Sequence, residues 1–183
     1  MASGDFKVLD VLWTHANVSK FEKYKIYMGC IISKLLYGLQ TAWLTKTQRS
    51  KLDGFHARCI RKIVGIRPSY WSRISNLEVL AHVRGEKLSI LLLQQQLSLF
   101  GKIFRKPSDD VVRQSIFEVN SDQLVMYSKQ RRRGRPKLSW AIELRKVAIQ
   151  ISGGSERLPG VMGNPCAWES AMKYWCRVNE YAS

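Results

Sequence analysis

The stretch TKTQRSKLDGFHARCIRKIVG, residues 45–65, decides the fold. Thr45 and Gln48 form a capping box, in which two side chains satisfy the free N–H groups at the start of a helix. Gly65 is placed to end the same helix. Between these signals apolar side chains recur every three or four residues, which predicts one buried face. That face comprises Leu52, Phe55, Cys59, Ile60 and Ile63.

The sequence on both sides of this stretch has the same helical pattern. Ser19 with Glu22 and Ser75 with Glu78 are two further capping boxes, each followed by apolar residues at helical spacing. We therefore predict helices at residues 20–41, 45–65, 86–105, 138–151 and 166–181, with a short helix after Ser75. Because the alternating pattern of β-strands is missing, the expected fold class is all-α.

The chain of 183 residues divides into three expected segments. Residues 1–107 are predicted to form a helical bundle, residues 108–137 a weakly structured basic connector, and residues 138–183 a small C-terminal helical subdomain. Within the last segment, the glycine- and proline-rich residues 152–165 predict a loop.

The charge of the chain indicates the class of partner. There are 30 Lys and Arg against 14 Asp and Glu, which gives a formal net charge of +16 and a pI near 10.0. Such an excess usually persists because a polyanion neutralises it. Nucleic acid, as RNA or an RNA/DNA duplex, is the expected partner, and an anionic membrane surface is the lesser alternative. The apolar runs are shorter than the roughly 18 to 20 residues that a membrane span needs, so no span is expected.

The predicted helix at residues 45–65 also carries a candidate binding surface. Its other face carries six basic side chains, with Asp53 as the single acid. A merely solvated face usually mixes signs, because like charges one turn apart repel each other. We therefore predict that this face contacts phosphates. Its candidate residues are Lys46, Arg49, Lys51, Arg58, Arg61 and Lys62.

A second candidate is the stretch SKQRRRGRPKLSW, residues 128–140, which holds six positive charges and no acid. Its Arg-Gly-Arg-Pro core matches an AT-hook, whose arginines enter a narrow minor groove. A solvated linker and one joint of a larger nucleic-acid machine are the alternatives. The residues expected to contact nucleic acid are Arg131, Arg132, Arg133, Arg135 and Lys137.

The residues that catalysis needs do not form a recognisable set. Asp109 and Asp110 are the one adjacent pair of acids, and helix capping explains them. The three histidines lack a partner nucleophile in a recognisable order, and the four cysteines lack the spacing of a zinc site. Cys30 and Cys59 are expected to be buried thiols. We therefore expect a protein that is not an enzyme and that has no metal and no cofactor.

Several motifs, taken in order, resemble one known family. KYKIYMGCIISKLLYGLQTAWLTKTQRSKLDGFHARCIRKIVGI, residues 23–66, is similar to the thumb of reverse transcriptases from non-LTR, LINE-like retrotransposons. RISNLEVLAHVRGEKLSILLLQQQLSLFGKIFRKP, residues 73–107, resembles the run that closes this thumb. RRRGRPKLSWAIELRKVA and AWESAMKYW resemble the post-thumb Gly-Arg-Pro element and the terminal Trp helix. Lys102 stands where the family often has His, and Ala141 and Ile142 replace a usual acidic pair.

The resemblance implies a thumb-like bundle that holds a template-primer duplex by its backbone. The catalytic palm and the endonuclease of the family have no counterpart in these residues, so the resemblance implies a thumb without polymerase activity. The Gly-Arg-Pro element then favours the post-thumb interpretation of residues 128–140 over an independent AT-hook.

Three functions follow as hypotheses. The first is a non-catalytic nucleic-acid-binding protein derived from a reverse-transcriptase thumb, which grips an RNA or RNA/DNA duplex through basic helices. The second is a recruited structural subunit of a large ribonucleoprotein, such as an organellar ribosome, with protein as well as RNA partners. The third is a polymerase component whose palm is supplied in trans. The sequence leaves the compartment open, with the nucleus or an organelle such as the mitochondrion expected.

Overall fold

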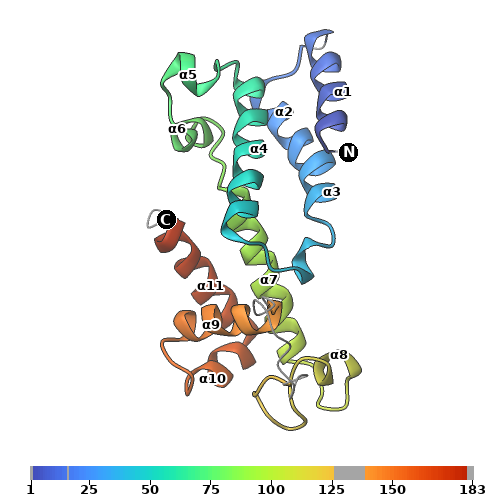
Figure 1. Ribbon diagram of the computed structural model, residues 1–183, viewed down its shortest axis with the longest axis vertical. Helices are drawn as coiled ribbons and strands as arrows, with labels where there is room; N and C mark the ends of the chain where they lie inside the picture. Colours follow the sequence, from blue (N-terminus) through green and yellow to red (C-terminus); the bar gives the residue numbers. More distant parts are fainter. Residues whose placement is uncertain (1, 16, 126–138, 181–183) are drawn as a thin grey trace, which may run out of the picture. The chain divides into compact units, whose positions relative to one another are not determined.

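The computed structural model describes residues 2–15, 17–125 and 139–180, which are predominantly helical (Figure 1). The helices in chain order are α1 Ala2–His15, α2 Lys20–Tyr27, the π-helical turn η1 Met28–Ile32, α3 Ser33–Leu36, the 3-10 turn η2 Leu39–Thr41, α4 Lys46–Val64, α5 Ser69–Ser72, α6 Asn76–Ala81, α7 Leu88–Phe104, α8 Val111–Gln114, α9 Trp140–Ser152, α10 Leu158–Gly163 and α11 Pro165–Glu180. The described residues contain no β-strand, only an isolated bridge between Phe117 and Leu124. The expected all-α fold class is confirmed.

The local signals for helix starts are confirmed. Each of the three predicted capping boxes is formed, at the beginning of α2, α4 and α6. In the third box Glu78 accepts a hydrogen bond from the Ser75 backbone N–H, which lowers the pKa of the carboxyl group. Gly65 ends α4 in the left-handed conformation, with a φ of 80°.

The predicted helix over residues 20–41 is interrupted and ends early. Its middle turn, η1, is π-helical, and the regular helix stops at Leu36. Tyr37 follows with an extended ψ of 125°, which breaks the helical hydrogen bonding before the separate turn η2. The spacing of apolar residues continues through this break, so sequence periodicity missed it.

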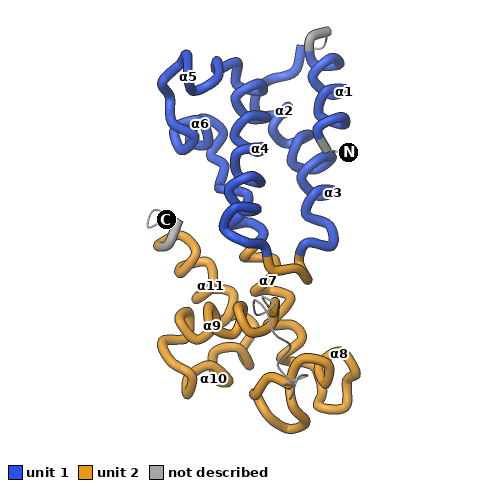
Figure 2. Tube along the Cα trace, in the orientation of Figure 1, with its two compact units in different colours: residues 1–39, 44–92 blue, residues 40–43, 93–183 orange. Residues whose placement is uncertain are grey.

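The chain forms two compact units (Figure 2). Unit 1 comprises residues 1–39 and 44–92, and it therefore contains α1 to α6 and the start of α7. Its core is built on α4 and on the helices from α1 to α3, with Tyr27, Ile31, Ile60 and Leu88 fully enclosed. The helix α1, which the sequence analysis did not predict, adds Phe6 and Trp13 to this core.

Unit 2 comprises residues 40–43 and 93–183 and is packed around aromatic side chains. Phe100 on α7 contacts the rings of Phe117 and Trp140. Trp168 on α11 donates a hydrogen bond from Nε1 to the Leu97 carbonyl oxygen over 3.2 Å. Its indole lies so close to Gly101 that a Cβ there would be 2.6 Å from Nε1.

The boundary between the units differs from the expected segments. It falls at residue 92, within α7, whereas the sequence suggested residue 107. Part of the expected connector is ordered, because Phe117 is buried against Phe100 and Phe104. The loop expected at residues 152–165 contains α10, which buries Leu158 and Met162 one helical turn apart. None of the described helices is long and apolar enough to cross a membrane.

Candidate nucleic-acid interface

The helix α4 presents a basic face, but with fewer residues than expected. Lys51, Arg58 and Lys62 are exposed and follow one another at spacings of seven and four residues, which places them on one side of the helix. Lys46, also exposed, stands a quarter turn or more away from this row at the first position of α4. We call Lys51, Arg58 and Lys62 the α4 basic face.

Arg61 does not belong to this face, and its expected phosphate contact is therefore corrected. Its residue surface is only 5% exposed, and its guanidinium group is used inside unit 1. Nη1 donates to the Arg67 carbonyl oxygen and the Ser72 hydroxyl, while Nη2 donates to the Ile74 carbonyl oxygen and Asn76 Oδ1. The four distances lie between 2.6 and 3.3 Å. The planar guanidinium fork suits such multiple acceptors, and no donor is left over for a ligand at those two nitrogens.

Arg49 is also directed partly into the protein. Its Nε donates to the Leu44 carbonyl oxygen over 3.2 Å, and the residue is half-buried. This bond ties the first turn of α4 to the segment before it. Arg49 is thus a weaker candidate for phosphate contact than the α4 basic face.

Asp53, the single acid of α4, is engaged with a residue of another helix. The Asp53 carboxylate accepts from the backbone N–H of Ser89 over 2.8 Å and from its hydroxyl over 2.7 Å. Ser89 lies in the first turn of α7, where backbone N–H groups have no partner inside the helix. Asp53 therefore caps α7 within unit 1 and leaves the α4 basic face without an acid from its own helix.

One acid from another helix does reach this face. Asp10 on α1 accepts from Lys62 Nζ over 3.2 Å, with both side chains well exposed. Lys62 Nζ also lies 5.8 Å from the centre of the Phe6 ring. An exposed ion pair contributes at most about 1 kcal/mol, so a phosphate can compete with Asp10 for this ammonium group.

The second candidate surface falls on residues 131–137. Arg131, Arg132, Arg133, Arg135 and Lys137 all lie outside the described residues. They remain a prediction from the sequence alone.

A buried polar pair lies beneath the α4 basic face. The Tyr27 hydroxyl and Nδ1 of His56 share a hydrogen bond of 2.9 Å, and both residues are fully buried. Burial lowers the pKa of His56 to about 4 and raises the pKa of Tyr27 above its ordinary value. His56 is thus neutral near pH 7 and contributes no charge to the face.

The cysteines do not form a common site. Cys59 is buried as expected, and burial raises the pKa of its thiol to about 11. The expectation for Cys30 is wrong, because this residue is exposed on η1. Within the described ranges, no three His, Cys, Asp or Glu residues gather as they would around a metal ion. Asp110 caps α8 by accepting from the N–H groups of Val112 and Arg113, as predicted.

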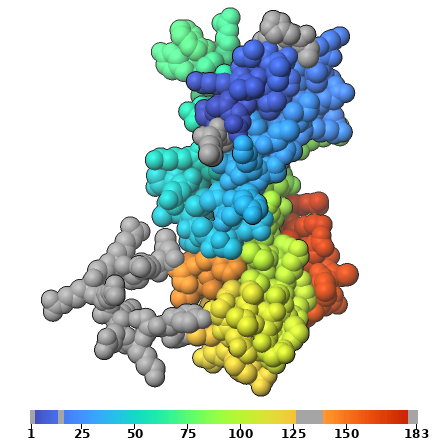
Figure 3. All heavy atoms as spheres, turned by 90° about the vertical axis from the view of Figure 1, so that its right-hand side faces the viewer, coloured from blue at the N-terminus to red at the C-terminus, as the bar shows by residue number. Residues whose placement is uncertain are grey.

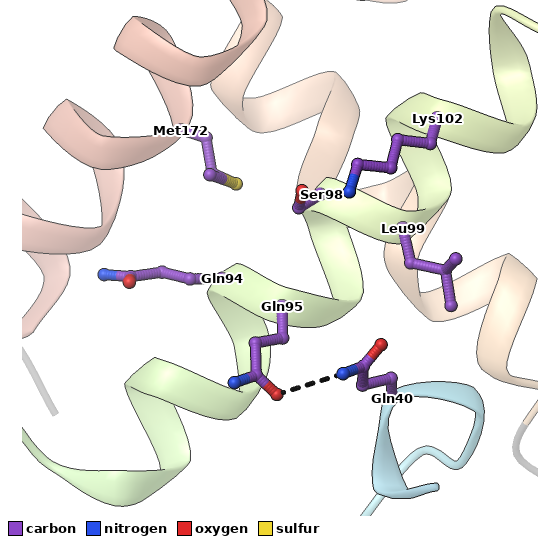
Figure 4. A pocket seen from close by; sticks show the side chains of 7 residues that line it. All are labelled: Gln40, Gln94, Gln95, Ser98, Leu99, Lys102 and Met172. Carbon is purple, nitrogen blue, oxygen red and sulfur yellow. Dashed lines mark hydrogen bonds between the residues drawn. The ribbon is translucent and has the colours of Figure 1, made fainter. Parts of the chain in front are cut away.

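Unit 2 contains an open depression of about 300 Å³ (Figure 4). Its lining combines polar groups of Gln40, Gln94, Gln95, Ser98 and Lys102 with the apolar side chains of Leu99 and Met172. Gln40 Nε2 donates to Gln95 Oε1 across one edge over 3.4 Å. Figure 4 shows the lining side chains spread around the rim, without a convergent set of reactive groups.

One exposed feature of unit 1 was not predicted from the sequence. Tyr70 and Trp71 on α5 are among its most exposed aromatic residues, in a segment between two predicted helices for which no site was predicted. The signal that could have identified them is compositional. Residues 66–75 contain two aromatics and two arginines and no acid.

Comparison with known proteins adds no family assignment. No protein-family model matches the chain, and neither does any curated protein or any solved structure.

Proposed function

We propose that this protein is a non-catalytic nucleic-acid-binding protein that holds an RNA or RNA/DNA duplex by its sugar-phosphate backbone. The observation that carries the proposal is the α4 basic face: Lys51, Arg58 and Lys62 are exposed together, while Asp53, the acid of the same helix, is engaged with Ser89. Positive side chains on a rigid helix attract phosphates and release their counterions.

The dimensions of the face suit a duplex backbone. An α-helix rises about 1.5 Å per residue, so Lys51 and Lys62 are separated by roughly 16 Å along the axis. This length reaches several phosphates of one strand. Contacts of this type recognise shape and charge rather than bases, because the deep groove of an A-form duplex excludes side chains.

The proposal extends to the origin of the chain. The motifs quoted above support descent from the thumb and post-thumb region of a non-LTR reverse transcriptase, through their order along residues 23–175. On this proposal the basic residues 131–137 add a second phosphate contact to that of α4.

The α4 basic face is tested by replacing Lys51, Arg58 and Lys62 with Gln in the full chain. Binding is measured as the slope of log K against log salt concentration, whose magnitude falls by nearly one for each phosphate contact that is lost. The triple variant should therefore reduce this slope by about 2 to 3. Affinity for a labelled RNA/DNA duplex is measured by fluorescence anisotropy across a salt series.

The matched control removes the same charge from unit 2, by replacing Lys102, Lys146 and Lys173 with Gln. These residues are exposed, and two of them form surface ion pairs that contribute little. We expect the slope and the duplex affinity to change clearly less in this control than in the α4 triple variant. Equal losses in both triple variants would mean that net charge alone attracts the duplex, and the assignment to α4 would be wrong.

A structural role in a ribonucleoprotein is the second candidate, and one observation favours it. Val8 and Leu12, one helical turn apart on α1, are exposed, as is Phe21 on α2. Exposed apolar side chains in a row are typical of surfaces that contact other proteins.

Sizing the native protein with its bound RNA and proteins distinguishes the two candidates. A stoichiometric place in a large particle, lost when Val8 and Leu12 are replaced by Ser, would support the structural role. A small species that binds a duplex without other proteins would support the free-standing function.

A further inference from the structure

The short helix α5 carries two large aromatic rings in solvent. Tyr70 is 83% exposed and Trp71 is 72% exposed. Their ring centres lie 5.3 Å apart at an interplanar angle of 86°, so one ring meets the other edge-on and flat ring faces stay uncovered. In Figure 3 the segment around α5 projects from unit 1 as the green group at the upper left.

The loop that presents these rings is held from inside by Arg61. The guanidinium group bonds the Arg67 carbonyl on one side of α5, the Ser72 hydroxyl within it, and the Ile74 carbonyl and Asn76 side chain after it. Within the turn, the N–H groups of Trp71 and Ser72 both donate to the Pro68 carbonyl. The aromatic pair is therefore mounted on a fixed support, which lowers the entropy that binding has to remove.

The charge around the pair indicates the class of ligand. Arg67 and Arg73, both exposed, lie three residues before Tyr70 and two residues after Trp71 in the chain, and residues 66–75 contain no acid. A partner must offer flat surfaces for the rings and negative charge for the arginines. Single-stranded nucleic acid offers both, because each unpaired base has a π-face and each nucleotide a phosphate. An acidic protein segment would satisfy the arginines but would not require open ring faces.

We infer that Tyr70 and Trp71, with Arg67 and Arg73, form a stacking site for unpaired bases of a nucleic-acid strand. This inference rests on the proposed function for the ligand class, but it concerns a different surface and a different state of the strand. The α4 basic face holds a duplex by its phosphates, and the α5 site holds a base that has left the duplex.

The test uses the full-length protein and three probes: oligo(dT), oligo(U), and a blunt RNA/DNA duplex. Trp71→Ala and Tyr70→Ala should each weaken single-strand binding by about 5- to 150-fold, the range of base–aromatic stacking, and change duplex binding by less than about 2-fold. Trp71→Phe keeps a ring and should restore much of the lost affinity. The matched control is Tyr37→Ala, which removes an aromatic residue that is 88% exposed elsewhere in unit 1. It should change neither the single-strand affinity nor the duplex affinity.

A charge variant adds a readout that a loss of folding cannot imitate. Arg73 has a φ of 53°, a conformation that glycine adopts more easily. Arg73→Gly should therefore keep or raise the melting temperature while it lowers the salt dependence of single-strand binding by about one phosphate contact, a slope change of roughly 0.7.

The outcomes separate this inference from the proposed function. Unchanged single-strand affinity in Trp71→Ala and Tyr70→Ala would overturn the inference and leave the α4 proposal standing if its triple variant loses duplex binding. Single-strand binding that depends on Trp71, together with duplex binding that is unchanged when Lys51, Arg58 and Lys62 are replaced, would support the α5 site and remove the α4 assignment. A protein partner that is lost with Trp71→Ala, with unchanged affinity for every oligonucleotide, would also overturn the inference.

Discussion

Unit 1 and unit 2 are both helical, but they differ in where their charges lie. Unit 1 contains fifteen Lys and Arg against six Asp and Glu. Unit 2 also contains fifteen basic residues, but six of them fall in residues 129–137, outside the described part. The rest of unit 2 has nine basic residues against eight acids, so its described surface is nearly neutral. A positive surface on a folded framework is thus a property of unit 1.

The interiors of the two units differ as well. Unit 1 buries ionisable side chains, His56 and Arg61, whereas the buried polar residues in the described part of unit 2 are the neutral Gln96 and Ser152. A buried charge has to be matched by fixed acceptors, which makes unit 1 sensitive to single substitutions and to pH. Unit 2 depends instead on close packing of aromatic rings.

The largest effect is expected for Arg61→Ala. This change leaves the Arg67 and Ile74 carbonyl groups without their donor in a partly buried site, which should destabilise unit 1 by about 3 kcal/mol. Hydrogen exchange followed on peptides from each unit should show faster exchange in unit 1. Arg58→Ala, an exposed arginine on the same helix, is the control and should cost about 0.5 kcal/mol or less. Equal effects would mean that Arg61 does not support the α5 loop.

The next effect is the pH dependence of unit 1. His56 has a pKa of about 4 when folded and about 6.5 when unfolded, so the unfolded state takes up a proton first as the pH falls. Its contribution is complete above pH 6.5 and is lost on acidification towards pH 4, a total of about 3 kcal/mol. The loss of stability is measured by urea unfolding of the wild type and of His56→Gln between pH 6.5 and pH 4. If His56→Gln kept the pH dependence of the wild type, groups other than His56 would cause the loss of stability in acid.

A steric test in unit 2 follows. Gly101→Ala would place a Cβ 2.6 Å from Nε1 and 2.8 Å from Cδ1 of Trp168, and the indole is held by its bond to Leu97. We expect a loss of about 1 to 3 kcal/mol from overpacking, seen as a lower melting temperature and faster exchange in unit 2 alone. A neutral result would show that α11 shifts to make room.

The smallest effect is expected for a second glycine-to-alanine substitution, this time in unit 1, where it should raise the stability. Gly54 lies inside α4, and a Cβ there would meet nothing within 4 Å. Gly54→Ala should therefore stabilise unit 1 by about 0.5 to 1 kcal/mol through helix propensity. Thermal unfolding of the two alanine variants side by side measures the contrast. A destabilised Gly54→Ala variant would indicate that the exposed side of α4 is packed against something else.

Local chemistry explains what could be predicted. The three capping boxes, the Gly65 terminus and the buried row on α4 depend on residues close together in the chain, so periodicity and spacing identified them. Trp168 and Met172, four residues apart on the last helix, are both buried, as the helical spacing of its apolar residues implies. The π-helical turn η1 and the helix α10, which lies in an expected loop, depend on packing and were not predicted.

The sequence by itself determined that this protein is helical, where most of its helices begin, and that it carries a large positive charge. It could not determine which basic residues face solvent. A helical pattern placed Arg61 with its charged neighbours, and only the fold supplied the carbonyl groups of residues 67 and 74 that draw it inside. The same fold turned Asp53 towards Ser89 and left Tyr70 and Trp71 exposed. Such contacts join residues distant along the chain, and their energies exist only once the helices are packed.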